Sequence, residues 1–292
     1  MNRPYVRAYH WMQNRLVQNL GDYLGAIVLE ALGFRVISCH SRSGLGINPG
    51  RCLLPIGSVL WDRTFERISV PVDVWGCGWR GEPLRADLKE RISFHAVRGP
   101  ETVHGLGLPP DIPQGDPALL LPRLMPQKPR SHGKAMVIPH YYRVNCMSAA
   151  RRCRDTGCDM LLSSRIISKP VPGVRPSPWG MWAMAKARLK LGVPIVTGRQ
   201  AINAIAGAGF VLTGSLHGAI LAQAYSIPWA AYNDGYVDLP AKWHDWAAYL
   251  RVRIDFVSDL EAGLDWWRAQ GSSGRIQDLD PLLTAFPYHG MQ

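Results

Sequence analysis

The sequence predicts an α/β protein with two doubly wound, Rossmann-like domains that face a cleft. Short apolar runs closed by glycine alternate with stretches of helical periodicity, which is typical of parallel sheets covered by helices. A proline-rich, basic and aperiodic stretch, residues 122–133, separates two such halves. We therefore expect an N-terminal domain over residues 1–125, a second over 134–255, and helices over 256–292 that pack back across both.

The first half contains the clearest helix, over residues 23–32. Apolar residues recur there at i, i+3, i+4, i+7 and i+8, and Gly33 is suited to end the helix. Strands are expected over residues 53–56, 70–75 and 95–97, because each is a short apolar run followed by a glycine turn.

The second half repeats this alternation from residue 135 onward. Ser258 and Glu261 have the spacing of a capping box ahead of a further helix. Residues 163–192 are irregular and basic, and either a membrane-contacting helix or a basic flap fits them. The remaining expected elements are strands over 135–138, 193–196, 210–213 and 229–232, helices over 200–206 and 219–225, and a turn over 214–218.

Composition excludes several classes of protein. Apolar residues make up 47% and charged residues 19% of the 292 residues, which is too apolar for a disordered chain. No apolar stretch is long and uninterrupted enough to span a membrane, and the N-terminus lacks a signal-peptide core, so secretion is not expected. The six cysteines form no C-x-x-C pair, so we expect free thiols in a reducing cytosol rather than a metal site.

The chain is strongly basic, with 33 Lys and Arg against 22 Asp and Glu and a net charge of +11. Such an excess suits nucleic acid, anionic lipid or a small anionic substrate, and charge alone does not choose among them. The sequence contains no Walker loop, no G-x-G-x-x-G and no G-x-S-x-G motif.

Three positions are candidates for chemistry because ligands bind beyond the carboxyl ends of parallel strands. Asp22 lies at the start of the first helix, where it either caps that helix or faces a ligand. His217 lies in a glycine-flanked turn after an apolar strand and is either structural or catalytic. Arg98 follows the strand over 95–97 and is either a surface residue or a bidentate ligand for a carboxylate or phosphate.

An ordered set of short motifs resembles the polysaccharide pyruvyl transferase family. The similarity is closest to the ketal pyruvate transferases of bacterial exopolysaccharides such as xanthan, and it runs from about residue 15 to 288. Two departures are a serine at position 215, where many members have arginine, and the long segment over 163–192. The motifs are Asn19-Leu20-Gly21-Asp22, Arg98-Gly99-Pro100, Gly115-Asp116-Pro117 and Ser215-Leu216-His217-Gly218.

This resemblance implies a GT-B-like arrangement and the transfer of pyruvate from phosphoenolpyruvate to two hydroxyls of one sugar, as a cyclic ketal with release of phosphate. It implies Asp22 as the base and His217 as the acid or phosphate partner. Arg98 and Lys242 would hold the carboxylate and phosphate of the donor. Residues expected to orient or bind substrate are Asn19, His140 and Ser215, whereas Asp116 is expected to fix a loop. No metal or cofactor is expected, since phosphoenolpyruvate is the donor substrate.

The resemblance also implies a lipid-linked oligosaccharide acceptor at the cytoplasmic face of the bacterial inner membrane. Basic residues would attract its diphosphate and anionic lipid. The residues expected to make that contact are Arg165, Lys169, Arg175, Lys186, Arg188 and Lys190. Two alternatives stay open: a nucleotide-sugar glycosyltransferase of the same architecture, and a basic nucleic-acid-binding protein, although no recognition motif favours nucleic acid.

Overall fold

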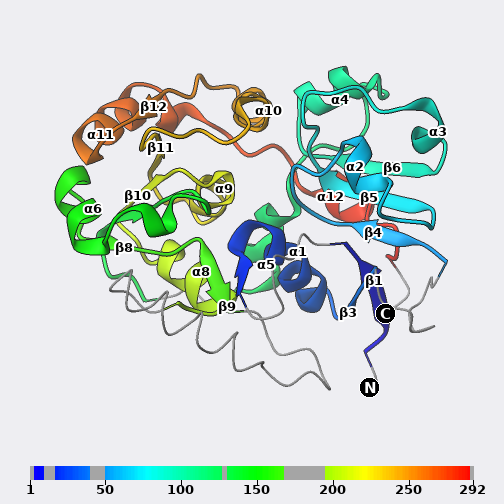
Figure 1. Cartoon of the computed structure of the whole chain (residues 1–292), viewed down its shortest axis with the longest axis horizontal. Helices are drawn as coiled ribbons and strands as arrows, with labels where there is room; N and C mark the ends of the chain where they lie inside the picture. The colour runs from blue at the N-terminus through cyan, green and yellow to red at the C-terminus, as the bar shows by residue number, and fades with distance from the viewer. Residues whose placement is uncertain (1–2, 10–16, 40–49, 127–129, 168–194, 290–292) are drawn as a thin grey trace.

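The computed structural model describes residues 3–9, 17–39, 50–126, 130–167 and 195–289, which form two parallel sheets with helices around them (Figure 1). The parallel α/β class expected from the sequence is confirmed. The first sheet has the order β3-β1-β4-β5-β6 and the second the order β12-β11-β10-β7-β8. The first sheet consists of β1 (Tyr5–Ala8), β3 (Arg35–Ser38), β4 (Cys52–Leu54), β5 (Val72–Cys77) and β6 (Ile92–Val97). The second consists of β7 (Ala135–Ile138), β8 (Met160–Leu161), β10 (Phe210–Thr213), β11 (Trp229–Tyr232) and β12 (Phe256–Val257).

Both sheets have the same doubly wound topology. Numbered by their order along the chain, the strands of each sheet lie in the sequence 2-1-3-4-5. The strand order therefore reverses between β1 and β4 in the first sheet and between β7 and β10 in the second. In open parallel sheets a ligand-binding crevice forms beyond the carboxyl ends of the strands at such a reversal.

The helices connect these strands and cover the sheets (Figure 1). The first half has α1 (Leu20–Ala31), α2 (Asp62–Phe65), α3 (Ala86–Lys89), α4 (Pro100–Leu106), the 3₁₀ turn η1 (Pro117–Leu120) and α5 (Leu121–Leu124). The second has η2 (Val144–Cys146), α6 (Ala149–Thr156), α8 (Gly198–Ala206), α9 (Leu216–Ala224), α10 (Pro240–Leu250), α11 (Leu260–Ala269), η3 (Gly271–Ser273) and α12 (Asp280–Thr284). A separate antiparallel pair joins β2 (Val17–Asn19) to β9 (Arg165–Ile167).

Helix α1 lies between the two halves and joins them. It follows β2, whose partner β9 belongs to the second half of the chain, and it packs against α8 and α9 (Figure 1). Leu24 of α1 is buried in the same hydrophobic core as Val137 of β7 and Trp75 of β5. The apolar stripe predicted over residues 23–32 is thus the packing face of α1, and it fixes the helix N-terminus relative to both sheets.

Residues from the C-terminal part of the chain pack onto the first sheet. The Trp75 indole N–H donates to the carbonyl of Leu282 at 2.8 Å, and the ring of Phe286 packs edge-on to that of Trp75 at 4.8 Å. The Tyr288 hydroxyl donates to Asp73 of β5 at 3.0 Å. These contacts tie the segment around α12 to the first sheet, while the domain limits at 125, 134 and 255 stay predictions.

Four local expectations need correction. The strand expected over 193–196 does not occur at residues 195 and 196, and 193–194 lie outside the described residues. Thr197 instead forms a capping box with Gln200 at the start of α8. The capping box expected at Ser258 is wrong, because Asp259 accepts from the N–H of Ala262 and Ser258 donates to Asp259. The separating stretch over 122–133 begins inside α5. Helix α9 begins at Leu216, so the turn expected over 214–218 is shorter than predicted.

The expectation of free thiols is also wrong for one pair of cysteines. Cys39, just after β3, and Cys52, which opens β4, have Cα atoms 5.6 Å apart and form a disulfide. Both strands neighbour β1, so the sheet brings together residues 13 apart in sequence. The argument from free thiols for a reducing compartment therefore fails. The remaining cysteines, all free, are Cys77, Cys146, Cys153 and Cys158.

Within the described ranges, no helix is both long enough and apolar enough to cross a membrane.

Candidate active site

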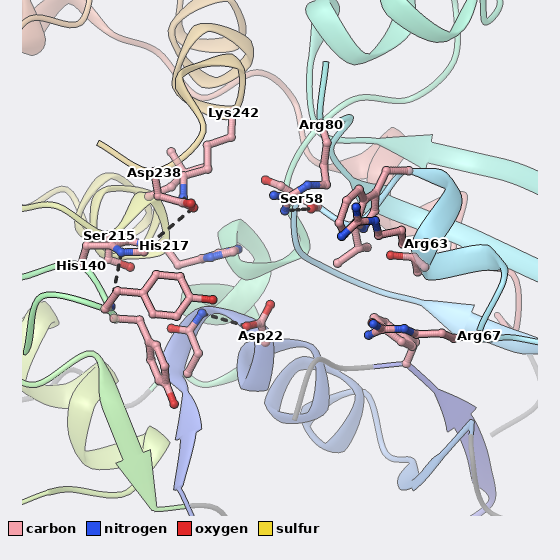
Figure 2. A pocket seen from close by; sticks show the side chains of 18 residues that line it. Asp22, Ser58, Arg63, Arg67, Arg80, His140, Ser215, His217, Asp238 and Lys242 are labelled. Carbon is pink, nitrogen blue, oxygen red and sulfur yellow. Dashed lines mark hydrogen bonds and ion pairs between the residues drawn. The ribbon is translucent and has the colours of Figure 1, made fainter. Parts of the chain in front are cut away.

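A pocket of about 310 Å³ opens where the strand order reverses in both sheets (Figure 2). Much of its lining comes from segments that follow the carboxyl ends of parallel strands, while Asn19 and Asp22 come from β2 and α1. Tyr9 follows β1 and Ser58 follows β4 in the first sheet. His140 follows β7 and Ser215 follows β10 in the second. Both halves of the chain thus contribute to the pocket.

Asp22 enters the pocket from the first turn of α1, where the free N–H groups of the helix favour a negative charge. The Asn19 side-chain N–H donates to Asp22 at 2.8 Å and holds the carboxylate in place. Burial raises the pKa of Asp22, while the Asn19 hydrogen bond and the nearby His217 oppose that rise. A carboxyl with a raised pKa accepts a proton more readily than an exposed one.

Gly21 allows the His217 imidazole to pack against α1. A Cβ added at Gly21 would overlap Nδ1 of His217, so only glycine leaves room for the ring. His217 itself lies in the first turn of α9, which starts at Leu216. The Asn19-Leu20-Gly21-Asp22 motif therefore supplies a hydrogen-bond donor, a contact surface for His217 and a carboxylate.

Asp116 lies behind His217 and not in the pocket lining. One carboxylate oxygen accepts from the N–H of Ala118 at 3.0 Å and caps η1, so the expected loop-fixing role is confirmed. The other oxygen lies 3.4 Å from Nε2 of His217, and the Asp116 side chain is fully buried. The sequence reading did not anticipate this carboxylate beside the imidazole.

Lys242, at the start of α10, makes an ion pair with Asp238, which also lines the pocket. Its Nζ donates to Asp238 at 2.6 Å, and Nε2 of His140 lies 3.5 Å from the same carboxylate. Burial lowers the pKa of Lys242, although the Asp238 partner opposes that shift. Burial alone would raise the pKa of Asp238, but His140 and Lys242 outweigh it and hold the pKa well below its usual range.

The structure thus brings together six of the seven predicted site residues, which are Asn19, Asp22, His140, Ser215, His217 and Lys242. The seventh, Arg98, is not part of the lining. Its side chain is completely buried and donates to Asp245 at 2.9 Å and to the hydroxyl of Ser58 at 2.6 Å. Arg98 therefore supports the Ser58 wall from behind, and direct contact with a donor substrate stays untested.

Three arginines that line the pocket had no place in the sequence reading. Arg63 and Arg67 lie in and just after the four-residue helix α2, and Arg80 follows β5. The guanidinium groups of Arg63 and Arg80 lie 5.1 and 4.6 Å from the Trp61 ring. Their only sequence signal was the i, i+4 spacing of Arg63 and Arg67, which is too common to indicate a site.

The basic group expected to contact a membrane is described at one residue only. Arg165 points inward, because its guanidinium donates to the carbonyl of Tyr141 at 3.3 Å and lies 4.8 Å from the Tyr141 ring. The expected contact of Arg165 with a membrane stays a prediction, although these contacts with Tyr141 engage its guanidinium. The other five residues lie outside the described ranges, as does most of the segment over 163–192.

No group of three or more His, Cys, Asp or Glu side chains in the described part of the chain could hold a metal ion. The polar groups of the pocket are instead cations, carboxylates and hydroxyls around the N-termini of α1 and α9. This arrangement can bind an anion and exchange protons with it.

Comparison with known proteins gives one informative relative. The chain is 26% identical over 288 residues to the succinoglycan biosynthesis protein ExoV of Rhizobium meliloti (strain 1021). The aligned region covers 94% of this chain and 77% of that protein. The match supports the resemblance to the polysaccharide pyruvyl transferases. No family model matches the chain.

Proposed function

We propose that the chain is a transferase of exopolysaccharide biosynthesis, which moves pyruvate from phosphoenolpyruvate to a sugar of the repeat unit as a cyclic ketal and releases phosphate. The observation that carries the proposal is the convergence of Asp22, His217 and Lys242 in one pocket between the two sheets. The similarity to a succinoglycan biosynthesis protein supports the same class of substrate. A GT-B-like arrangement of the two halves is part of this proposal.

The donor carries a phosphate and a carboxylate, and the inner part of the pocket offers cationic groups for both. Lys242 and Arg80 line it from opposite halves of the chain. The N-termini of α1 and α9 add N–H groups that have no partner within their helices. Ser215, the residue before α9, presents its hydroxyl beside these groups. Arg80 replaces the buried Arg98 as the arginine that we assign to the donor.

The chemistry requires one proton to be added to carbon and two to leave hydroxyls. Protonation of the methylene carbon makes C2 electrophilic, and the first sugar hydroxyl adds to C2 and loses its proton. The C2–O bond to phosphate then breaks, and the second hydroxyl adds to C2 and closes the ketal. Of the two protons lost by the sugar, one balances the new methyl group and the other leaves on phosphate.

Asp22 and His217 are placed to carry these protons. The raised pKa of Asp22 suits a base that takes a proton from a sugar hydroxyl. His217, held between Gly21 and Asp116, is assigned as the acid or phosphate partner. His140 and Asn19 orient the pocket, His140 through Asp238 and Asn19 through Asp22.

The direct test is phosphate release from phosphoenolpyruvate with a lipid-extracted oligosaccharide pool, together with a mass gain of one pyruvyl ketal on the acceptor. Asp22→Asn and His217→Gln should each lower turnover by about 100- to 10,000-fold, the usual size of a general acid–base contribution. The exposed carboxylate Asp265 on α11 provides the matched control, Asp265→Asn, which should leave turnover unchanged. Full activity of both site variants would reject the assignment.

The same assay separates the alternatives. Release of a nucleotide from a sugar nucleotide, without phosphate release from phosphoenolpyruvate, would identify a glycosyltransferase instead. Salt-sensitive DNA binding with neither activity would indicate a nucleic-acid-binding protein. Because we propose catalysis without a metal or cofactor, a chelator should leave the rate unchanged.

We further propose that the acceptor is lipid-linked and that the enzyme meets it at the cytoplasmic membrane surface. The net charge of +11 supports attraction to an anionic surface. Co-sedimentation with vesicles that contain anionic lipid tests this contact, and equal binding to neutral vesicles would contradict it.

A further inference from the structure

One wall of the pocket carries two arginines that the donor chemistry does not use. Arg63 and Arg67 both line the pocket, and both are exposed to solvent. They come from the segment around α2, which follows β4 of the first sheet. We call Arg63 and Arg67 the outer arginine pair.

The outer arginine pair has no carboxylate partner among the described residues. Some exposed arginines in the described residues do have one, such as Arg85 with Asp87 at 2.7 Å and Arg253 with Asp255 at 2.8 Å, whereas others, such as Arg199 and Arg251, do not. Counted over the described residues, the pocket lining has two carboxylates, Asp22 and Asp238, and four cationic side chains, Arg63, Arg67, Arg80 and Lys242. The outer part of the pocket is therefore positive and attracts anions.

Aromatic neighbours hold the outer arginine pair in place. The Arg63 guanidinium lies 5.1 Å from the centre of the Trp61 ring. The Tyr9 hydroxyl hydrogen-bonds with Thr64 and Arg67. Burial raises the pKa of Tyr9, so the hydroxyl stays neutral at physiological pH. Guanidinium groups fixed in this way lose less entropy when they bind an anion than free side chains would.

The outer arginine pair lies apart from His217 and Lys242, while Arg80, also assigned to the donor, shares the Trp61 ring with Arg63. Figure 2 shows Arg63 and Arg67 on the opposite side of the pocket from His217 and Lys242, with Asp22 between the two sides. Phosphoenolpyruvate has two anionic groups, and Lys242, Arg80 and two helix N-termini already suffice for them. The outer arginine pair therefore lies on the far side of the proposed base and is available to the second substrate.

We propose that Arg63 and Arg67 form a subsite for an anionic group of the acceptor. This inference rests on the proposed function for the name of the second substrate. The chemistry is recognition of an oxyanion by two guanidinium groups. The oxyanion is either a phosphate of the lipid diphosphate or the carboxylate of an acidic sugar, and two separate probes distinguish these sources.

The first experiment measures binding without turnover. The protein is saturated with phosphoenolpyruvate and titrated calorimetrically with inorganic pyrophosphate and, separately, with glucuronate. One of these probes should bind the wild type, and the double variant Arg63→Gln with Arg67→Gln should weaken that binding at least about tenfold, as expected for the loss of charge-assisted hydrogen bonds. Arg268→Gln, an exposed arginine paired with Asp265 on α11, is the control and should bind like the wild type.

The outcomes separate the inference from the proposed function. If phosphoenolpyruvate itself does not bind, the proposed function fails, and the same titration of the free protein still tests the outer arginine pair. If neither probe binds the wild type, or if the double variant binds as tightly as the wild type, the subsite is rejected. Preference for pyrophosphate assigns the diphosphate, and preference for glucuronate assigns an acidic sugar.

The second experiment uses steady-state kinetics with the native acceptor. In the double variant the acceptor KM should rise at least about tenfold, while the KM for phosphoenolpyruvate and kcat stay unchanged. A rise in the phosphoenolpyruvate KM would place the outer arginine pair at the donor and overturn the proposal. Both side chains are exposed, so unchanged thermal unfolding of the variant should confirm that it folds.

Discussion

Helix α10 takes part in two short ion pairs that differ in burial and in access to the pocket. Asp245 pairs with Arg98 at 2.9 Å, and both side chains are at most 2% exposed. Lys242, one turn earlier, pairs with Asp238 at 2.6 Å, but these side chains are 10% and 26% exposed and line the pocket. Asp245 of the first pair also accepts two hydrogen bonds from Thr102, so this pair is buried and has its hydrogen bonds within the protein. We call it the closed pair.

The difference shows that charge and motif membership do not identify a binding residue. Arg98 and Lys242 were assigned the same role by resemblance, yet only Lys242 meets the pocket. A buried pair that loses one partner leaves an uncompensated charge, whereas a pocket cation that is removed leaves its partner in contact with water. Variants at the two positions should therefore separate stability from binding.

The largest expected effect is on stability at the closed pair. Arg98→Ala should lower the free energy of unfolding by about 3–5 kcal/mol, because Asp245 would keep its charge without a cation. Denaturant unfolding measures this change. Arg85→Ala removes an exposed arginine paired with Asp87 and should leave the free energy of unfolding nearly unchanged. If Arg98→Ala lowered the free energy of unfolding by less than about 1 kcal/mol, Asp245 would not be shielded from water as the structure indicates.

A shape change in the pocket should come next. Gly21→Ala places a Cβ where Nδ1 of His217 lies, so the ring must move and turnover should fall about 100-fold. The unfolding free energy should fall by only about 1–3 kcal/mol, the usual cost of overpacking. Gly50→Ala meets no atom within 4 Å and is the matched control. Normal turnover of Gly21→Ala would show that the position of His217 is not critical.

Removal of the pocket cation should affect binding rather than stability. Lys242→Met should weaken phosphoenolpyruvate binding by about 10- to 150-fold, the range for a hydrogen bond to a charged group. Its unfolding free energy should change by less than about 1 kcal/mol, since Asp238 keeps His140 beside it and has access to water. Calorimetric titration and denaturant unfolding of the same variant test both statements, and a reversed pattern would remove the contrast with Arg98.

The smallest expected effect concerns Asp73, an intermediate case. Burial alone would raise its pKa, but hydrogen bonds from His95, Arg51 and Tyr288 lower the pKa from 3.8 to about 2. A lowered pKa contributes stability that is present above pH 4 and is lost as the pH falls toward 2. The advantage of the wild type over Asp73→Asn should therefore shrink by about 1 kcal/mol between pH 6 and pH 3. A difference that stays constant over this range would contradict the shift.

The fold class could be predicted from the sequence, and so could six of the seven candidate residues that line the pocket. The strands over residues 135–138, 210–213 and 229–232 were predicted with their observed bounds, because each is a fully buried apolar run. Strand β12 was missed, because it has two residues and only partial burial. The start of α9 was placed too late, since Gly218 reads as a turn residue but packs against Thr213 of β10.

The rest of the site depends on distances in space that one sequence does not encode. Arg98 and Asp245 are 147 residues apart, and only the fold shows that their side chains pair, at 2.9 Å. Arg63 and Arg67 belong to no motif, and they reach the pocket because α2 follows β4 at the strand-order reversal. Asp116 was predicted from its motif to fix a loop, while its approach to His217 depends on how η1 packs against α9.

The contacts of Leu282 and Tyr288 with the first sheet have a consequence for biosynthesis. Trp75 bonds to a residue 207 positions downstream, and Asp73 to one 215 positions downstream. At a translation rate of about 5–20 residues per second, β5 emerges on the order of 10–40 seconds before these partners. The half of the chain that is made first is therefore completed late, and until then Trp75 lacks the Leu282 carbonyl and Asp73 lacks the Tyr288 hydroxyl.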